Sequence, residues 1–343
     1  MKILITGGAG FIGINAASRF LEENNKVIIF DDLLRKGAAA NVKWLRSHGK
    51  FEFIKGDIRN YKQVKSCFLR HKDIGAVLHL AAQVAVTDSI LNPRKDFETN
   101  ALGTFNICEG ARQVQPEAVI LNASTNKVYG SLNDLEIIEE NGIYKYKALP
   151  YGISETRFLD FCSPYGCSKG SADQYVRDYT KTYALKSVTF RQSCIYGSRQ
   201  FGTEDQGWVA WFTICAVLGN PITIYGDGKQ TRDVLFIGDL LDCYLSALNR
   251  INEISGETYN IGGGPENVLS PLRLVSILEQ ISGIKIKYSL SDWRLGDQKV
   301  FICDIRKALK DFKWKPKIKT EEGIKRLFEW ISENKKLLST IKK

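Results

Sequence analysis

The chain has 343 residues, of which 44% are hydrophobic and 25% charged, with 29 glycines and 8 prolines. This composition is ordinary for a soluble globular protein and excludes collagen, a coiled coil and a disordered chain, while the length predicts two structural units or one large one. The 48 lysines and arginines outnumber the 38 aspartates and glutamates, and we interpret the net charge of +10 as a basic solvated surface, because no basic and aromatic residues interleave as in a nucleic-acid groove.

Short runs of β-branched residues alternate with longer helical patterns in the first half of the chain. The predicted strands are Lys2–Thr6, Lys26–Asp31, Phe51–Lys55, Ala76–Leu80, Ala118–Ala123 and Ser187–Arg191. The predicted helices are Gly13–Glu23, Tyr61–His71, Phe97–Gln113 and Ser163–Tyr183. This alternation predicts an α/β fold of the Rossmann type, in which a doubly wound parallel sheet binds ligands at the carboxyl ends of its strands.

The alternation ends after Arg191, where stretches containing glycine and charged residues separate shorter elements. We assign residues 1–193, with a returning segment of about 233–262, to a dinucleotide-binding domain. Residues 194–232 and 263–343 are assigned to a smaller, discontinuous α/β domain that binds the substrate. The segment 131–162 has weak periodicity, and so long a connection is typical of a functional lid or of disorder.

A glycine loop follows the first predicted strand. Gly7, Gly10 and Gly13 have the spacing G-x-x-G-x-x-G, which lets backbone amides and a helix N-terminus approach a pyrophosphate. The second strand ends at Asp31, whose carboxylate can accept hydrogen bonds from an adenosine ribose and would repel a ribose phosphate. This arrangement favours NAD over NADP, although turn glycines alone are the alternative interpretation.

Two further polar positions end strands of the predicted sheet. Asp57 and Ile58 follow the third strand, where they can contact an adenine, but an isolated turn aspartate fits this position nearly as well. His79 ends the strand beside the glycine loop, and we interpret it as a hydrogen-bonded core histidine rather than a catalytic one.

The segment that begins at Ser163 predicts a helix start, with an N-cap serine, proline at the first helical position, and Tyr165 and Lys169 one turn apart on one face. A free tyrosine, with a pKa of about 10, is a poor base at neutral pH. A neighbouring ammonium favours the phenolate and lowers that pKa. Thr125, after the fifth strand, offers a hydroxyl to the same substrate oxygen. The spacing Y-x-x-x-K also occurs by chance in amphipathic helices.

Several patterns bear on the cellular setting. The longest mainly apolar run, Trp208 to Leu218, has about half of the roughly 20 residues that a membrane-spanning helix needs, and we interpret it as core or subunit interface. The apolar run at the N-terminus ends at Gly7, too short for a secretory signal. The 8 cysteines include no C-x-x-C pair, and the 3 histidines are scattered. We therefore expect a cytoplasmic protein with reduced cysteines, no membrane partner and no metal.

Together these motifs resemble the extended short-chain dehydrogenase/reductase family of nucleotide-sugar epimerases and dehydratases, over nearly the whole chain. The resemblance rests on the glycine loop, Leu80-Ala81-Ala82, Asn100, Ser124-Thr125, Tyr165 and Lys169. It implies that Thr125, Tyr165 and Lys169 are catalytic and that NAD is tightly bound and recycled. The implied cofactor-binding residues are Gly7, Gly10, Phe11, Ile12, Gly13, Asp31, Asp32, Arg35, Asp57, Ile58, Leu80, Ala81, Ala82, Asn100, Tyr165 and Lys169. For Asn100, an ordinary helix-packing amide is the alternative.

Departures from the family's pattern narrow the implied reaction. Asn126 and Lys127 follow Thr125, where the dehydratases carry an Asp-Glu pair as acid and base. Cys194 stands where hexose 4-epimerases and dehydratases carry an asparagine that binds the diphosphate. Longer stretches, including 92–97, 159–170 and 297–301, are similar to 2-epimerases of CDP-linked 3,6-dideoxyhexoses. This similarity implies conversion of CDP-paratose to CDP-tyvelose through a transient 2-ketosugar that is reduced again from its other face.

The resemblance also implies a set of substrate contacts, namely Gln83, Thr125, Ser193, Arg199, Gln206, Arg232, Arg294 and Asp297. The three arginines are placed near the two phosphates, because a guanidinium fork suits phosphate oxygens, although each can instead form a surface ion pair. The expected partners are a nucleotide sugar and further copies of the chain, as a dimer or tetramer, with no nucleic acid. Two other functions stay open: a UDP-hexose 4-epimerase or other nucleotide-sugar oxidoreductase, and a non-catalytic NAD-binding protein.

Overall fold

The structure is a computed structural model that describes residues 1–294 and 296–342, and the chain divides into two compact units. Unit 1 contains Met1–Val128, Phe161–Arg191 and Leu241–Tyr259. Unit 2 contains Tyr129–Asp160, Gln192–Leu240 and the chain from Asn260 onward. The sequence analysis assigns the segment 131–162 to the dinucleotide-binding domain. In the structure, most of this segment belongs to unit 2.

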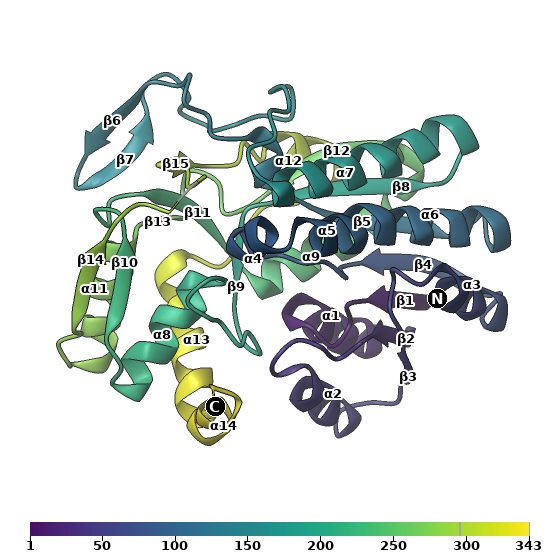
Figure 1. The fold of residues 1–343 in the computed structure, drawn as a ribbon, viewed down its shortest axis with the longest axis horizontal. Helices are drawn as coiled ribbons and strands as arrows, with labels where there is room; N and C mark the ends of the chain where they lie inside the picture. Colours follow the sequence, from purple (N-terminus) through teal and green to yellow (C-terminus); the bar gives the residue numbers. More distant parts are fainter. Residues whose placement is uncertain (295, 343) are drawn as a thin grey trace. The chain divides into compact units, whose positions relative to one another are not determined.

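A sheet of seven strands organises unit 1 (Figure 1). The strands are β1 (Lys2–Thr6), β2 (Lys26–Asp31), β3 (Glu52–Lys55), β4 (Ile74–His79), β5 (Val119–Thr125), β8 (Ser187–Gln192) and β12 (Thr258–Ile261). Their order is β12-β8-β5-β4-β1-β2-β3, and β1–β2, β1–β4, β2–β3 and β4–β5 pair in parallel. The predicted Rossmann-type parallel sheet is confirmed. Because the order reverses between β1 and β4, ligands are expected at the carboxyl ends of these two strands.

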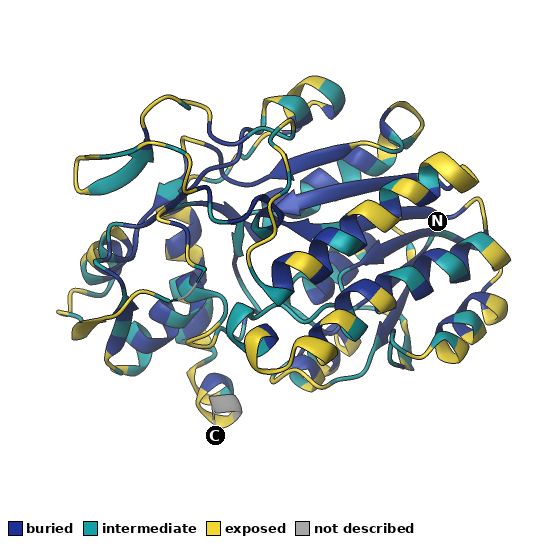
Figure 2. Ribbon diagram, turned by 45° about the horizontal axis from the view of Figure 1, so that its top comes forward, coloured by how far each residue is buried: buried dark blue, intermediate teal, exposed yellow. Residues whose placement is uncertain are grey.

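Helices cover both faces of this sheet. They are α1 (Phe11–Glu22), α2 (Ala38–Arg46), α3 (Tyr61–Arg70), α4 (Val86–Leu91), α5 (Pro93–Phe97), the π-helix η1 (Glu98–Leu102), α6 (Gly103–Val114), α7 (Pro164–Tyr183), α9 (Ile237–Asn249) and α10 (Ile251–Ile254). Side chains of α3, α6 and α7 form one core cluster with strand residues such as Leu4, Val77 and Ile120. Except for the edge strand β3, the strands are buried along most of their length (Figure 2), as expected for a sheet that is covered on both sides.

Two helix starts show how local sequence sets the elements of unit 1. Ser163 caps α7 by accepting a hydrogen bond from the Gly166 amide at 3.0 Å, and Pro164 occupies the first turn, as the sequence predicts. The predicted helix Phe97–Gln113 is interrupted, because a π-turn over Glu98–Leu102 separates α5 from α6. A π-turn adds one residue to the ring of each hydrogen bond, which a helical apolar pattern does not reveal.

Unit 2 is built from several small sheets and a helical layer. Its strands are β6 (Ile137–Glu140), β7 (Ile143–Tyr146), β9 (Cys194–Tyr196), β10 (Ile222–Tyr225), β11 (Thr231–Phe236), β13 (Val268–Leu269), β14 (Tyr288–Ser291) and β15 (Val300–Phe301). Its helices are α8 (Trp208–Leu218), α11 (Pro271–Ser282), α12 (Arg306–Phe312), α13 (Thr320–Glu333) and α14 (Lys335–Lys342). A short 3-10 helix, η2 (Asn126–Tyr129), follows β5. The apolar run of α8 packs against α11 and α13, so it belongs to the core of unit 2.

The segment 131–162 is ordered by pairing within unit 2. It contains the antiparallel hairpin β6–β7. Farther along, the Ile153 amide donates to the Ile302 carbonyl at 2.8 Å, and the Asp304 amide donates to the Ile153 carbonyl at 2.9 Å. In the part of the chain that the structure describes, none of the helices has the length and apolar character needed to cross a bilayer.

Candidate active site

The glycine loop of unit 1 packs too tightly for side chains. Gly7 has a φ of +66°, and a Cβ placed on it would lie 2.7 Å from the Ala81 amide nitrogen. A Cβ on Gly13 would lie 2.4 Å from the Gly7 carbonyl oxygen. Gly10 is the N-cap of α1 and provides no side-chain cap, so the amides of Phe11–Gly13 form an uncapped helix N-terminus, which favours an anion.

The carboxylate of Asp31, at the carboxyl end of β2, is tied to this loop. Its Oδ2 accepts a hydrogen bond from the Ala9 amide at 3.0 Å, and its Oδ1 accepts one from the Leu33 amide at 2.8 Å. Burial raises the pKa of Asp31, while the two amides and the cation of Arg35 oppose that rise. The Asp32 carboxylate accepts a hydrogen bond from the Leu34 amide at 3.0 Å. The carboxylate of Asp31 is thus bonded directly to the glycine loop.

Other predicted cofactor contacts have protein partners of their own. The Asp57 carboxylate forms a two-pronged ion pair with Arg59, with distances of 3.0 Å to Nε and 2.6 Å to Nη2. Ile58 is buried in the core cluster of α3 and α6. Leu80 donates its amide to the carbonyl oxygen of Thr6 at 3.1 Å, which holds the segment after β4 beside β1.

His79 is a satisfied core residue. Its Nδ1 lies 2.7 Å from the Thr6 hydroxyl and its Nε2 lies 2.9 Å from the Thr104 hydroxyl. Burial, reinforced by the positive charge of Lys169, lowers the pKa of His79 to about 3. The ring is therefore neutral at physiological pH, in agreement with the interpretation made from the sequence.

Thr125, Tyr165 and Lys169 are brought together by β5 and α7. Thr125 ends β5 and hydrogen-bonds the Tyr165 hydroxyl, and both side chains are buried. One turn further along α7, the Lys169 Nζ donates to the Ala123 carbonyl oxygen at 2.6 Å. The helix start at Ser163 therefore presents the phenol and the ammonium to the carboxyl end of the strand that carries Thr125.

The pKa of Tyr165 differs from the expectation that the ammonium of Lys169 lowers it. Burial raises the pKa of Tyr165 to about 12, with Asp96 adding to the rise and with the Thr125 hydrogen bond and the cation of Arg35 opposing it. Burial also lowers the pKa of Lys169 to about 8, against the pull of Asp173 and Asp96. In the protein alone, desolvation outweighs any stabilisation of a phenolate by the neighbouring ammonium. Tyr165 is therefore a neutral phenol at pH 7 before ligands bind.

Two predicted residues, Gln83 and Asn100, belong to a buried polar cluster beside α7 whose other members, Asp96 and Ser168, were not predicted from the sequence. Asn100, in the π-turn, is fully buried, and its Oδ1 accepts from the Gln83 amide at 2.8 Å. Its Nδ2 donates to the Asp96 carboxylate at 3.1 Å and to the Ser168 hydroxyl at 3.0 Å. Asp96, Asn100 and Thr104 are all buried. Their spacing of four residues places them on one side of a helix, and this row of polar residues is the sequence pattern that could have indicated the cluster.

A buried ion pair lies on the other side of Lys169. The Asp173 carboxylate receives Arg191 Nε at 2.9 Å and Nη2 at 3.1 Å, and the Ser124 hydroxyl donates to it at 2.8 Å. These contacts fix α7 to β5 and β8. A buried pair of this kind adds little net stability, but removal of one partner costs about 3–5 kcal/mol.

Two of the three arginines predicted to contact the substrate, Arg232 and Arg294, form ion pairs in unit 2. Arg232 Nη2 lies 3.2 Å from Asp297 Oδ1. Arg294 pairs with Asp205 at 3.4 Å, and its guanidinium lies 3.9 Å from the centroid of the Tyr225 ring. Both pairs place a guanidinium where an incoming anion can compete with a partly exposed carboxylate.

Other predicted substrate contacts of unit 2 have mixed environments. Arg199 lies 5.7 Å from the centroid of the Trp330 ring, and burial lowers the pKa of its guanidinium to about 10. The Ser193 hydroxyl donates to the main-chain carbonyl of the buried Asp233 at 3.1 Å. Gln206 pairs with Thr203 through main-chain hydrogen bonds of 2.9 and 3.1 Å. Cys194, at the position of the missing asparagine, accepts from the indole of Trp208 at 3.0 Å.

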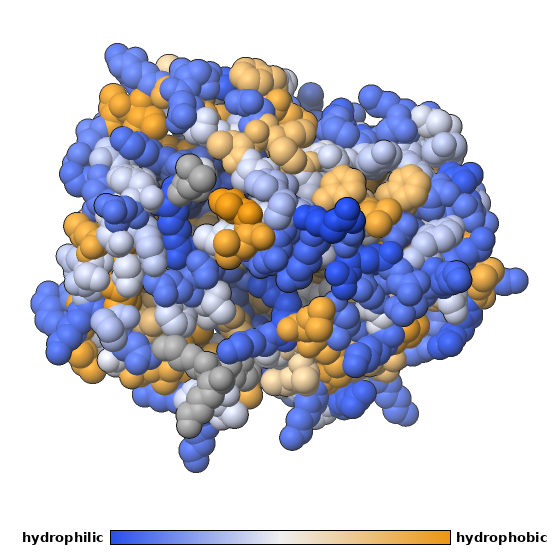
Figure 3. Space-filling model, viewed as in Figure 1, coloured by the Kyte–Doolittle hydropathy of each residue, from blue (hydrophilic) through white to orange (hydrophobic). Residues whose placement is uncertain are grey.

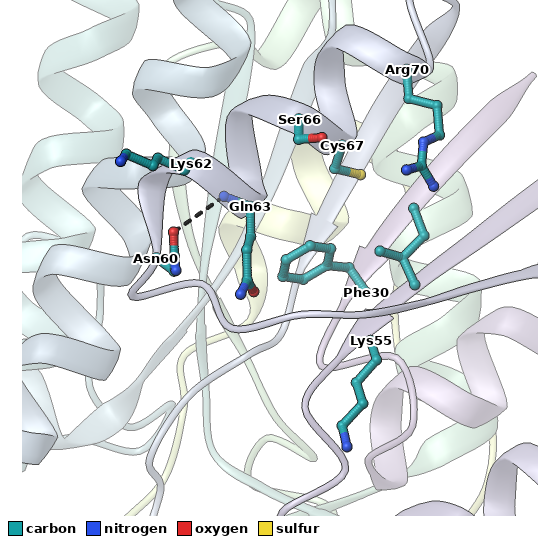
Figure 4. Close-up of a pocket in the computed structure, with 9 residues that line it drawn as sticks. Phe30, Lys55, Asn60, Lys62, Gln63, Ser66, Cys67 and Arg70 are labelled. Atoms are coloured by element: carbon teal, nitrogen blue, oxygen red, sulfur yellow. Dashed lines mark hydrogen bonds between the residues drawn. The ribbon is translucent and has the colours of Figure 1, made fainter.

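A separate cavity of about 310 Å³ lies between the edge strand β3 and α3 (Figure 4). It is lined by Phe30, Ile54, Lys55, Asn60, Lys62, Gln63, Ser66, Cys67 and Arg70, none of which is a predicted site residue. Figure 4 shows Lys55 and Lys62 extending away from each other, so the cavity does not gather its cations around one point. Among the described residues, no group of three or more His, Cys, Asp or Glu side chains is arranged to hold a metal ion.

Comparison with known proteins places nearly the whole chain in one family. A family model described as GDP-mannose 4,6 dehydratase matches residues 4–327. CDP-paratose 2-epimerase of Salmonella typhi is 45% identical over 337 residues, which are 97% of this chain and 99% of that protein.

Solved structures agree in fold. The UDP-glucose 4-epimerase of Thermotoga maritima with UDP-glucose superposes with a TM-score of 0.84 at 29% identity, covering 97% of this chain and 99% of that one. The UDP-glucuronic acid 4-epimerase of Bacillus cereus, in complex with UDP-glucuronic acid and NAD, gives a TM-score of 0.82 at 29% identity with the same coverage.

Proposed function

The chain belongs to the family of NAD-dependent nucleotide-sugar epimerases and dehydratases, and we propose that within it the protein is a 2-epimerase that converts CDP-paratose to CDP-tyvelose. It is an enzyme, and its cofactor is NAD. The observation that carries the substrate is the 45% identity to CDP-paratose 2-epimerase over 97% of the chain. In addition, Asn126 and Lys127 supply no acid and base pair for a dehydration.

The residues of unit 1 fit NAD. The loop from Gly7 to Gly13 leaves no room for a Cβ at either end, and α1 has no side-chain cap, which suits a pyrophosphate. The carboxylates of Asp31 and Asp32 suit the ribose hydroxyls and disfavour the extra phosphate of NADP. We propose that these residues hold the cofactor and that Lys169 and Tyr165 contact its nicotinamide ribose.

The proposed chemistry is a proton transfer performed by the buried group on β5 and α7. Bound NAD would supply the acceptor for a hydride from carbon 2 of the sugar and would return that hydride, and its oxidised form would add a positive charge to the site. That charge would favour the phenolate of Tyr165, which takes the proton of the sugar hydroxyl and later gives it back. Thr125, hydrogen-bonded to that phenol, orients the same oxygen. Lys169 is anchored to the Ala123 carbonyl at 2.6 Å and presents an ammonium to the site.

Inversion requires the sugar to turn between the two hydride transfers while its diphosphate stays held. We propose that Arg199, Arg232 and Arg294 of unit 2 bind the diphosphate. The pairs of Arg232 with Asp297 and of Arg294 with Asp205 are partly exposed, so a phosphate can replace each carboxylate at small cost. Gln83, Ser193 and Gln206 complete the proposed substrate contacts.

We also propose that the protein works as a homo-oligomer in the cytosol. Unit 1 exposes apolar and aromatic side chains on α4 to α7, and Figure 3 shows apolar patches on one face of the molecule. The exposed side chains are Leu91, Phe97, Leu102, Tyr175 and Tyr183. None of the 8 cysteines forms a disulfide bond, which suits a reducing compartment. Light scattering on the eluting protein checks the assembly: a dimer or tetramer is expected, and a monomer would contradict it.

Incubation of the purified protein with CDP-paratose, followed by NMR of the sugar, tests the substrate. Formation of CDP-tyvelose without added NAD is expected. If CDP-paratose stays unchanged while UDP-glucose is converted to UDP-galactose, the protein is a UDP-hexose 4-epimerase instead. Consumption of added NAD in proportion to turnover would mean a net oxidation. Absence of turnover on any nucleotide sugar would support a non-catalytic role.

A further inference from the structure

Asp96 is a buried carboxylate behind α7 that has no role in the mechanism above. Its exposure is 0%, and it lies one helical turn before Asn100 at the junction of α5 and the π-turn η1. Burial of an ionised carboxylate is costly unless it is paired or well hydrogen-bonded. The contacts of Asp96 therefore need an explanation.

Those contacts join three segments of unit 1. Asp96 Oδ1 accepts from Gln83 Nε2 at 3.1 Å and from Asn100 Nδ2 at 3.1 Å. Its Oδ2 accepts from the hydroxyl of Ser168, the residue that immediately precedes Lys169. The carboxylate thus links the segment before α4 and the π-turn to the turn of α7 that carries Tyr165 and Lys169. Gln83 is itself a proposed substrate contact, so the link reaches both the sugar side and the proton-transfer side.

The charge of Asp96 is compensated differently from that of Asp173, the other buried acid that acts on Lys169. Asp173 is neutralised by the two hydrogen bonds of Arg191. In the described part of the chain, the hydrogen-bond partners of Asp96 are amides and a hydroxyl and include no cation. The charged groups that act on it are Lys169 and Asp88.

We propose that Asp96 is a positioning residue of the epimerase: its carboxylate fixes the catalytic turn of α7 against Gln83, and its charge keeps Lys169 an ammonium. This inference rests on the proposed function, because it assigns Lys169 and Tyr165 to proton transfer. It adds a residue that touches neither the substrate nor the cofactor and that acts through its neighbours.

The sign of the electrostatic effect follows from the groups that face the pair. Asp173 and Asp96 both raise the pKa of Lys169, which burial has lowered to about 8, so loss of Asp96 lowers that pKa further. Asp96 also raises the pKa of Tyr165, whereas Arg35 and the Thr125 hydrogen bond lower it, so loss of Asp96 lowers this pKa too. Both limbs of a pH–rate profile should therefore move to lower pH when the charge is removed.

Asp96→Asn tests the charge with the least disturbance. The amide oxygen keeps the bonds from Gln83 and Asn100, and the new amide group donates to the Ser168 hydroxyl. The Ser168 proton is then free to turn toward the Tyr165 carbonyl oxygen, 3.2 Å away. With the NAD-bound enzyme, the kcat profile of this variant is expected to move to lower pH by about one unit.

Ser168→Ala is the matched control, because it removes the hydrogen bond between Ser168 and Asp96 and keeps the charge of Asp96. We expect kcat to fall on the order of tenfold, through misplacement of the catalytic turn, with both limbs at their wild-type pH. An Asp96→Asn profile that superimposes on the wild type overturns the electrostatic role. A Ser168→Ala variant with wild-type kcat overturns the positioning role.

Hydrogen–deuterium exchange gives a readout that needs no turnover. In Ser168→Ala and in Asp96→Ala, amides of residues 80–85 and 163–170 should exchange faster, while those of unit 2 keep their wild-type rates. Unchanged exchange in both variants, or faster exchange throughout the chain, overturns the proposed link. If the wild type converts no nucleotide sugar, the proposed function has failed, whereas the exchange comparison still decides whether Asp96 holds the turn.

Discussion

The two units of the molecule prepare their functional groups in different ways. In unit 1, Thr125, Tyr165 and Lys169 are buried and bonded to strand and helix partners before any ligand binds. In unit 2, Arg232 and Arg294 are partly exposed, and each pairs with one carboxylate, at 3.2 and 3.4 Å.

This difference suits the two tasks that we propose for the units. Proton transfer needs groups fixed to a fraction of an ångström in a site of low polarity, and buried hydrogen bonds provide that order at a cost in desolvation. Binding of a diphosphate needs cations that give up one anion for another, and exposed pairs, worth about 0–1 kcal/mol, exchange easily. Changes in unit 1 should therefore act mainly on kcat, and changes in unit 2 mainly on KM.

The largest effect is expected for Tyr165→Phe. Removal of the hydroxyl deletes the proton acceptor and keeps the ring in its buried place, so kcat should fall by about 100-fold or more while NAD stays bound. Sugar NMR measures the turnover, and absorbance after denaturation measures the cofactor. A variant that retains wild-type kcat would remove Tyr165 from the mechanism.

Gly13→Ala should weaken cofactor binding, because its Cβ would lie 2.4 Å from the Gly7 carbonyl oxygen. Overpacking of about 1–3 kcal/mol corresponds to a loss of NAD affinity of roughly 10- to 100-fold. Gly10→Ala is the matched control, since its Cβ would lie 3.2 Å from the same oxygen and its φ is −70°. Equal NAD occupancy in the two variants, measured by mass spectrometry, would show that the tight packing of the loop does not matter for the cofactor.

Arg232→Ala tests the other unit. Loss of one guanidinium contact to a phosphate should raise KM about tenfold and leave kcat within about a factor of two. Arg250→Ala removes an exposed cation that pairs only with Glu253 among the described residues, and it should change neither constant. A fall in kcat with unchanged KM in Arg232→Ala would contradict the expectation that changes in unit 2 act mainly on KM.

The smallest expected effect is a dependence on alkaline pH. The pKa of Lys169 is about 8, so the ammonium is present below that pH and is lost as the pH rises through it. In the NAD-bound enzyme, where the proposed mechanism needs Tyr165 already ionised, the rate should therefore decline above about pH 8. His79, whose pKa is about 3, does not titrate at alkaline pH and does not contribute to this decline. A rate that still rises at pH 10 would mean that Lys169 acts without its charge.

Short-range patterns were enough to predict the sheet, the tight glycine loop and the placement of Tyr165 and Lys169 on one face of a helix. Gly7 and Gly13 lie within one loop and the helix that follows it, and Tyr165 and Lys169 lie one helical turn apart, so the spacing of each pair encodes its geometry. The interruption at η1 was missed, because the apolar period continues through the π-turn.

Long-range polar contacts account for what the sequence did not reveal. Asp96 meets Ser168 across 72 residues, and Asp173 meets Arg191 from another element. No local pattern couples such pairs. The expected effect of Lys169 on the Tyr165 pKa was wrong for a similar reason, because desolvation depends on the whole surrounding core.

The most direct test of the central claim follows a hydrogen atom. CDP-paratose labelled with deuterium at carbon 2 is converted by the enzyme in ordinary water, and the product is analysed by NMR. Transient oxidation at carbon 2 with return of the same hydride predicts CDP-tyvelose that retains its deuterium at carbon 2. Product that carries hydrogen from water at this carbon would contradict the account.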